Sequence, residues 1–385
     1  MNPANNFLET HNEEFIHDLS FDFFGKRIAT CSSDHIIRIY SKNDKGNWVK
    51  TTSFEAHDGI IWKVKWAHPD YGSIIATCSA DKTVMIWEEK KPSSTKSSTP
   101  HSLKVEEEEF LWSNRMKLFE SKESIEDIKF APKHMGLVIA SASADGSVRI
   151  YEAADLMRLN SWKAPYRIEV NTLGINCISW NKNPFDPPMI AVGSKDATNS
   201  LMNKSVMKTQ HTHSQSTSIE NAKTGSAEDK YLSIYVYKGD HWAFSTFLSF
   251  ESPSGEKIEH KYAVNDVSWN QLNGRSYHLI SSCGKDGVFV WYIKITKEDN
   301  QGPVIKILDA KKVYSGVTIW KCSFNIMGTL LSFSGQDNKV RICKGGYDRS
   351  WGVVEEFEEE GIEEEDGDSN ASQTDERGLN RNRMI

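Results

Sequence analysis

The chain has 385 residues, of which 38% are hydrophobic and 11% aromatic, and its formal net charge is −7. The segment from Glu355 to Ile385 holds twelve acidic residues against three arginines, a local charge of −9, so the remainder is close to +2. A near-neutral body lacks the overall basic field that nucleic-acid-binding proteins usually carry. Composition therefore argues against direct binding of nucleic acid.

No run approaches the roughly 18 consecutive apolar residues that a membrane-spanning helix needs. Residues 1–11 are polar and lack the apolar centre of a signal peptide. The six cysteines lie far apart, each inside an apolar strand-like segment, where a reduced thiol packs as a small hydrophobic group. We therefore expect a soluble protein of the cytosol or the nucleus.

One pattern recurs six times along the chain: an apolar strand, a turn, a second strand rich in Ala, Ser and Cys, an aspartate, and a third strand that usually ends in an aromatic residue. The copies start at Ile16, Ile61, Ile125, Ile175, Val264 and Ile319. β-Branched and aromatic residues favour strands, and repeats of this length are typical of propeller blades. We predict an all-β fold, a six-bladed WD-repeat β-propeller.

Each copy carries an aspartate at the same phase, where a Ser-x-Asp turn lets the carboxylate accept local backbone N–H groups. The turn residues are Asp34, Asp81, Asp145, Asp196, Asp286 and Asp337. In this repeat class an upstream histidine and a strand-end tryptophan join the aspartate in a hydrogen-bonded tie. His57, Asp81 and Trp87 form the fullest set, whereas His11 and Asp34 are followed by Tyr40.

Histidine and aspartate pairs could instead form a catalytic or metal site. An aspartate that recurs in every blade indicates a structural role, and His211 and His213 have no further ligands at suitable spacing. No nucleophile elbow, phosphate loop or zinc motif is present. We therefore expect a protein that is not an enzyme, with no catalytic residue, metal or cofactor.

Polar segments interrupt the repeats at residues 88–109 and 197–230. They contain too little apolar surface to offset the entropy cost of ordering, so we expect loops. The like-charge run from Glu355 is typical of a solvated, disordered tail. We divide the chain into an N-terminal arm (1–14), a propeller (15–354) and an acidic tail (355–385).

A blade of this class has four strands, and the outermost comes from the segment that leads to the next copy. The candidate outer strands are residues 48–57, 111–120, 157–162, 242–250, 304–310 and 350–359. The last of these completes blade six and leaves Asn6–Asn12 as a spare strand. We predict an open ring whose sheet edges accept strands of a partner, with Phe7, Leu8, Glu9 and Thr10 as the candidate partner-binding residues.

Several stretches resemble the Seh-one nucleoporins, and the similarity spans about residues 7–351. They are WAHPDYG (66–72), KFAPKHMGL (129–137), SADGSVRIYEA (143–153) and GRSYHLI (274–280). The resemblance implies an open propeller that an α-solenoid nucleoporin completes with its own strands, in the Y-shaped scaffold of the nuclear pore at the nuclear envelope. It also implies a place among the subunits of a TOR-kinase regulatory complex on the surface of the vacuole or lysosome, without insertion into the membrane.

Two other functions stay open at this point. One is that of a vesicle-coat propeller like the related Sec-thirteen family, which shares the WAHP element. The other is a peptide-reading adaptor, which needs arginines or an aromatic cage at the central channel. Arg38, Arg149 and Arg341 occupy equivalent positions in their third strands, where strand alternation favours a surface between blades over the channel.

Overall fold

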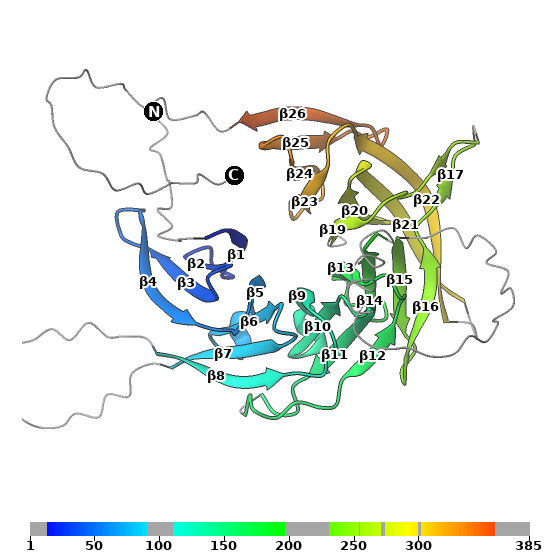
Figure 1. Ribbon diagram of the computed structural model, residues 1–385. Helices are drawn as coiled ribbons and strands as arrows, with labels where there is room; N and C mark the ends of the chain where they lie inside the picture. Colours follow the sequence, from blue (N-terminus) through cyan, green and yellow to red (C-terminus); the bar gives the residue numbers. More distant parts are fainter. Residues whose placement is uncertain are drawn as a thin grey trace, which may run out of the picture.

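The computed structural model describes residues 14–90, 111–156, 158–196, 231–253, 255–270, 274–298 and 302–358. Its strands form six four-stranded sheets arranged around a central axis, and a further sheet of two strands (Figure 1). Within each blade the strands pair antiparallel in chain order, from the innermost to the outermost. The predicted six-bladed, all-β propeller is confirmed.

The first three blades occupy the N-terminal half of the chain. Blade one contains β1 (Ile16–Phe21), β2 (Arg27–Ser32), β3 (Ile36–Lys42) and β4 (Trp48–Glu55). Blade two contains β5 (Ile61–Trp66), β6 (Ile74–Ser79), β7 (Val84–Lys90) and β8 (Leu111–Leu118). Blade three contains β9 (Ile125–Phe130), β10 (Val138–Ser143), β11 (Ser147–Glu152) and β12 (Tyr166–Glu169). The 3-10 turns are η1 (Pro69–Tyr71) and η2 (Lys133–Met135).

The other three blades follow the same order. Blade four contains β13 (Ile175–Trp180), β14 (Met189–Ser194), β15 (Leu232–Tyr237) and β16 (Trp242–Phe247). Blade five contains β19 (Val264–Trp269), β20 (His278–Gly284), β21 (Gly287–Glu298) and β22 (Gly302–Tyr314). Blade six contains β23 (Ile319–Phe324), β24 (Leu330–Gly335), β25 (Lys339–Gly345) and β26 (Trp351–Glu358). A small hairpin, β17 (Phe250–Glu251) and β18 (Lys257–Ile258), follows blade four.

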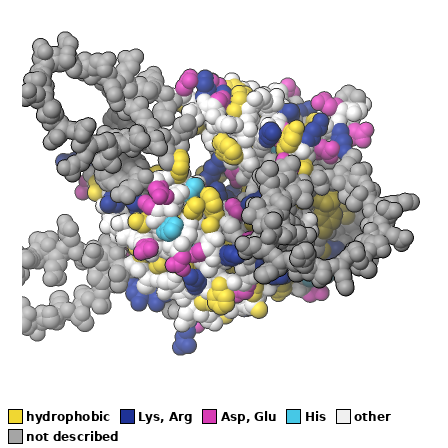
Figure 2. All heavy atoms as spheres, viewed as in Figure 1, with side chains coloured by type: hydrophobic (Ala, Val, Ile, Leu, Met, Phe, Trp, Pro, Cys, Tyr) yellow, Lys and Arg dark blue, Asp and Glu magenta, His cyan; other side chains and the backbone are white. Residues whose placement is uncertain are grey.

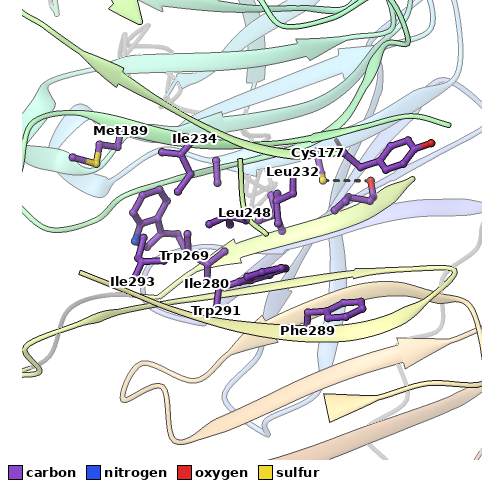
Figure 3. Close-up of a cluster of buried hydrophobic side chains, with 14 of the residues drawn as sticks. Cys177, Met189, Leu232, Ile234, Leu248, Trp269, Ile280, Phe289, Trp291 and Ile293 are labelled. Carbon is purple, nitrogen blue, oxygen red and sulfur yellow. Dashed lines mark hydrogen bonds between the residues drawn. The ribbon is translucent and has the colours of Figure 1, made fainter. Parts of the chain in front are cut away.

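The core lies between neighbouring blades, because the sheets of blades two to five bury both of their faces against the sheets beside them. Strands β6, β10 and β14 are buried along their whole length. Between blades four and five, Trp269 and Trp291 are fully buried among aliphatic side chains of β14, β15 and β20 (Figure 3). Burial of large aromatic and aliphatic side chains is the main stabilising contribution in such a sheet stack.

Blade three departs from the sequence-based expectation at its outer strand. Residues 157–162 were expected to form it, but the outer strand is β12, Tyr166–Glu169, which pairs with β11. Trp162 makes only an isolated bridge with Ala153, and its indole N–H donates to the carbonyl of Leu159 at 2.8 Å. The segment therefore folds on itself, and its apolar residues pack against the blade without extending it.

Two strands extend past the boundaries expected for the propeller. β7 continues to Lys90, and β26 continues to Glu358, so the acidic run begins inside a strand. There Glu356 accepts hydrogen bonds from Lys339 (2.9 Å) and Arg341 (2.8 Å) of β25. These two cations offset the negative charge of the carboxylates on the outer strand. The rest of the arm, the insertions and the tail lie outside the described residues, so the proposed division stays a prediction.

Within the described part of the chain, no helix has the length and hydrophobicity that crossing a membrane requires.

Candidate functional site at the seam between blades one and six

Neighbouring blades pack against one another at five interfaces of the ring, and the interface between blades six and one differs. The innermost strands of consecutive blades pack against one another from β1 to β5, β9, β13, β19 and β23. Strand β23 has no comparable packing against β1, and the two blades lie on either side of a gap (Figure 1). We call this gap, with the faces of blades one and six that border it, the seam.

On blade one, the seam exposes side chains that are buried in every other blade. Leu19 is the fourth residue of its inner strand and is 50% exposed. The residues at the same position in the other blades are at most 2% exposed: Val64, Ile128, Ile178, Val267 and Cys322. Ile16, at the first position, is also exposed, at 39%. Because the fourth-position residues pack against the preceding blade, Leu19 lacks the neighbour that its equivalents have.

On blade six, the opposite face is exposed in the same way. Val340 of β25 is 44% exposed. Its equivalents in the other blades are at most 2% exposed and pack against the following blade: Ile37, Val84, Val148, Leu232 and Val288. Phe357, which pairs with Val340 across β25 and β26, is also exposed. The two faces that would pack together in a closed ring are therefore both apolar and both uncovered.

Two loops of blades one and six also carry exposed apolar side chains, and both contact the neighbouring blade: the Phe23 ring lies 4.9 Å from that of His68 in blade two, and Arg275 of blade five donates to the carbonyl of Met327 at 2.7 Å. Phe23 and Phe24 lie in the β1–β2 loop, and Ile326 and Met327 lie in the equivalent β23–β24 loop. All four side chains are more than half exposed. In the space-filling view, yellow hydrophobic side chains lie on both sides of the gap (Figure 2). Exposed apolar clusters of this kind mark interaction surfaces.

One ion pair bridges the seam near the channel. Lys321 of β23 lies 2.7 Å from the carboxylate of Asp18 on β1. Asp18 also pairs with Lys65 and accepts the backbone N–H of Val64 at 3.3 Å. Burial alone raises the pKa of Asp18, but Lys65, Lys321 and Lys63 outweigh it and hold this pKa far below the ordinary value. Asp18 is therefore a buried, ionised anchor that binds Lys65 and the backbone of β5 in blade two and also contacts Lys321 of blade six.

The predicted tie of blade two is formed by four side chains. The His57 Nδ1 lies 2.9 Å from the carboxylate of Asp81, and its Nε2 lies 2.7 Å from the hydroxyl of Thr77. The indole N–H of Trp87 donates to that hydroxyl at 3.1 Å. The arrangement is internal to the blade and joins the turn to the strands.

Blade five has an equivalent tie that the sequence analysis missed. His260 lies 2.8 Å from Asp286 and 2.7 Å from Ser282, to which Trp291 donates at 2.8 Å. The signal was present, because His260 precedes Asp286 by 26 residues, close to the 24 that separate His57 from Asp81.

In blades one, three and six an arginine of the third strand pairs with the turn aspartate, and His11 of blade one lies outside the described residues. Arg38, Arg149 and Arg341 pair with the turn aspartate four residues earlier, at 2.7, 2.6 and 2.5 Å respectively. All three side chains are buried, and Arg341 lies 4.6 Å from the centre of the Tyr314 ring on β22 of blade five, in line with the expectation of a surface between blades. The spacing Asp-x-x-x-Arg was visible in the sequence, and these cations are unavailable to bind a peptide at the channel.

Some predicted residues are not placed in a site. Asp196 directly precedes residues 197–230, which the structure does not describe, so its role in a turn stays a prediction. Phe7, Leu8, Glu9 and Thr10 lie outside the described residues. Among the residues that are described, no group of three or more His, Cys, Asp or Glu side chains is arranged to hold a metal ion.

The tie of blade two gives a prediction for stability against acid. Burial raises the pKa of Asp81, but hydrogen bonds from His57 and Thr83 outweigh it and place this pKa well below the ordinary value. A lowered folded-state pKa adds stability that is fully present above the unfolded pKa, near 4, and that is lost as the pH falls from there through the folded-state pKa. Asp81→Asn should lower the free energy of unfolding by about 1–3 kcal/mol at pH 7, with a smaller difference from the wild type at low pH.

Urea titrations between neutral and acid pH measure this difference. Asp58→Asn is the matched control, because the Asp58 side chain is 89% exposed, and it should change stability little. A difference between Asp81→Asn and the wild type that stays constant with pH would contradict this explanation.

Comparison with known proteins identifies the class first. The repeats, the ties and the six blades are those of a WD-repeat propeller, and the family model "WD domain, G-beta repeat" matches residues 3–41 and 48–88. Nucleoporin SEH1-A of Xenopus laevis is 35% identical over 357 residues, 90% of this chain and 86% of the frog protein. Nucleoporin SEH1 of Homo sapiens is 35% identical over 355 residues, 89% of this chain and 85% of the human protein. The chain belongs to the nucleoporin SEH1 family.

Proposed function

We propose that the chain is a non-catalytic scaffold subunit of the nuclear pore, located at the nuclear envelope in the Y-shaped complex. In this proposal an α-solenoid nucleoporin inserts strands into the seam and supplies a further blade. The observation that carries the proposal is the pair of uncovered apolar faces around Leu19 and Val340, whose equivalents elsewhere in the ring are buried by a neighbouring blade.

A blade inside the ring is stabilised by apolar packing against a neighbouring blade on each of its two faces. Inserted strands would bury the exposed apolar side chains of both seam faces. They would restore the packing that the five interfaces between consecutive blades already have. Burial of apolar surface contributes roughly 25 cal/mol per Å². The inserted sheet would also gain main-chain hydrogen bonds if the N-terminal arm joined it as a strand, as expected for strand addition.

The family resemblance extends the proposal to a second assembly. The same seam would serve a TOR-kinase regulatory complex on the vacuole or lysosome surface, where a solenoid subunit would bind in the same way. A vesicle-coat role like that of the Sec-thirteen family would use the same geometry with another partner. The alternative function, a peptide-reading adaptor, has less support, because the three arginines proposed to bind the peptide are paired with turn aspartates.

Charge introduced into the seam tests the proposal. Leu19→Asp and Val340→Asp should each reduce recovery of the pore-scaffold partner in affinity purification by at least about tenfold, because each would bury an unpaired carboxylate in the interface. Both side chains are exposed in the free chain, so neither change should unfold it. The tagged variants should also lose the nuclear-rim signal seen by fluorescence microscopy.

Val49→Asp is the matched control, since Val49 lies on the outer strand β4 of blade one and is 49% exposed. It should leave recovery unchanged. Deletion of residues 6–12 should weaken recovery as the seam variants do. Full recovery of the scaffold with Leu19→Asp, Val340→Asp and the deletion would rule out the seam as the binding site.

A further inference from the structure

A second recess lies at one mouth of the central channel, away from the apolar faces of the seam. A cavity of about 790 Å³ is formed where the inner strands of blades three to six end. Its lining includes Lys129, Lys133, Lys182 and Lys321, and a single acidic residue, Asp266. None of the ties described above contributes to this cavity.

The cavity lies on the face of the ring opposite the turn aspartates. Its residues come from the carboxyl ends of inner strands and from the loops that follow them, such as Lys129 at the end of β9 and Lys182 after β13. The turn aspartates lie at the other end, because the end of each second strand pairs with the start of the first, as Ser32 does with Ile16. The cavity is therefore a separate site on the propeller.

Two of the four lysines already have ion-pair partners, Lys321 with Asp18 and Lys133 with Asp70, so Lys182 and Lys129 are the cations available to a ligand. Lys182 has no ion pair with any described residue, and Lys129 approaches Asp127 only to 3.8 Å. Desolvation and the nearby charge of Lys129 lower the pKa of Lys182. The carboxylate of Asp266 is already occupied by the backbone N–H groups of Val267 (3.0 Å) and Cys322 (3.2 Å).

We propose that this cavity binds an acidic peptide segment of another protein. Lys182 and Lys129 would pair with its carboxylates, and the cavity walls formed by Phe130, Pro132 and Pro184 would contact its apolar side chains. A bound peptide would desolvate the lysines and so strengthen the attraction. Lys321 of the lining also pairs with Asp18 across the seam, but the apolar residues of the seam faces do not line the cavity, so this role does not depend on strand insertion there.

Two other occupants fit the structure less well. A nucleic acid needs exposed aromatic faces for stacking, but Trp180 in the lining is only 3% exposed. The chain's own acidic tail starts beyond Glu358. Strand β26 is antiparallel to β25, which places Glu358 opposite Lys339 and on the face of the turn aspartates, away from the cavity.

Fluorescence polarisation with the full chain tests the proposal. The probe is a short labelled peptide of alternating glutamate and leucine, and the comparison peptide has glutamine in place of glutamate. The acidic peptide should bind, its affinity should fall as salt rises, and the glutamine peptide should bind at least about tenfold more weakly. Lys182→Glu should weaken binding by a similar factor.

Lys50→Glu is the control, because it reverses the same charge on the outer strand β4 and should leave affinity unchanged. Lys182→Gln should give an intermediate loss, and thermal melts should show both Lys182 variants folded. Equal affinity of the Lys182 and Lys50 variants, or no binding of the acidic peptide, would overturn the proposal. Tighter binding of a single-stranded oligonucleotide, or binding of the peptide only after removal of residues 359–385, would assign the cavity to nucleic acid or to the tail.

Discussion

Ile128→Ala should lower the free energy of unfolding by about 3 kcal/mol, whereas Leu19→Ala should lower it by less than about 1 kcal/mol. The two residues occupy the same position of their blades and lose the same number of carbon atoms. Ile128 is fully buried between blades two and three, while Leu19 is 50% exposed at the seam. The cost of truncation depends on the cavity that it leaves, and an exposed side chain leaves none.

Urea unfolding of the two variants, each compared with the wild type, measures this contrast. The comparison needs no partner, so it reports on the ring alone. An equal loss for Leu19→Ala and Ile128→Ala would mean that the seam is closed in the free chain, and the account of an uncovered face would be wrong.

Asp18→Ala should be among the most destabilising single changes, at about 3–5 kcal/mol, because it removes one member of a buried ionic cluster. Asp18 is 4% exposed and holds Lys65, Lys321 and the backbone of β5. Without its carboxylate, Lys65 would keep a buried charge without its ion-pair partner. Equilibrium unfolding gives the magnitude, and calorimetry shows whether the transition stays cooperative.

Lys321→Met separates the two partners of Asp18. The Lys321 side chain is 48% exposed, so its loss should cost no more than about 1 kcal/mol. A loss as large as that of Asp18→Ala would show that the ion pair across the seam, and not the pair with Lys65, stabilises blade one. A negligible loss for Asp18→Ala would contradict its role as an anchor.

The repeated pattern predicted the architecture well because every blade buries the same positions. Recurring aspartates, β-branched residues and strand-end aromatics defined six blades, and the structure contains all six. The outer strand of blade three was missed because Leu159 and Trp162 are apolar for a different reason, a local turn that packs against the blade. An apolar residue in the sequence indicates burial but not the element that it packs against.

The sequence predicted that the ring is open between blades one and six, but not which side chains this opening exposes. Counting strands indicated a complete blade six and an open ring, but Leu19 and Val340 look like core residues in the sequence. Their exposure follows from the missing neighbour, which no local pattern records. The arginine ties were likewise missed, because alternation along a strand predicts the side of a residue but not the turn carboxylate within its reach.

The lysine cavity was missed for a similar reason. Lys129, Lys182 and Lys321 are scattered over three blades and form no basic run in the sequence. Only the arrangement of the blades around the channel brings them to one mouth. The seam and the cavity together give the propeller two distinct surfaces, one apolar and one basic.

Thiol labelling tests the central claim, that the seam is uncovered in the free chain and is covered by a partner's strands. The six native cysteines are all free and buried, so a cysteine introduced at Leu19 or Val340 adds a single exposed thiol. Maleimide should label both positions rapidly in the free chain, and the solenoid partner should slow labelling at least about tenfold. Val49→Cys, on β4 away from the seam, should label at the same rate with and without the partner. Slow labelling of Leu19→Cys in the free chain, or unchanged labelling at both seam positions in the complex, would contradict the claim.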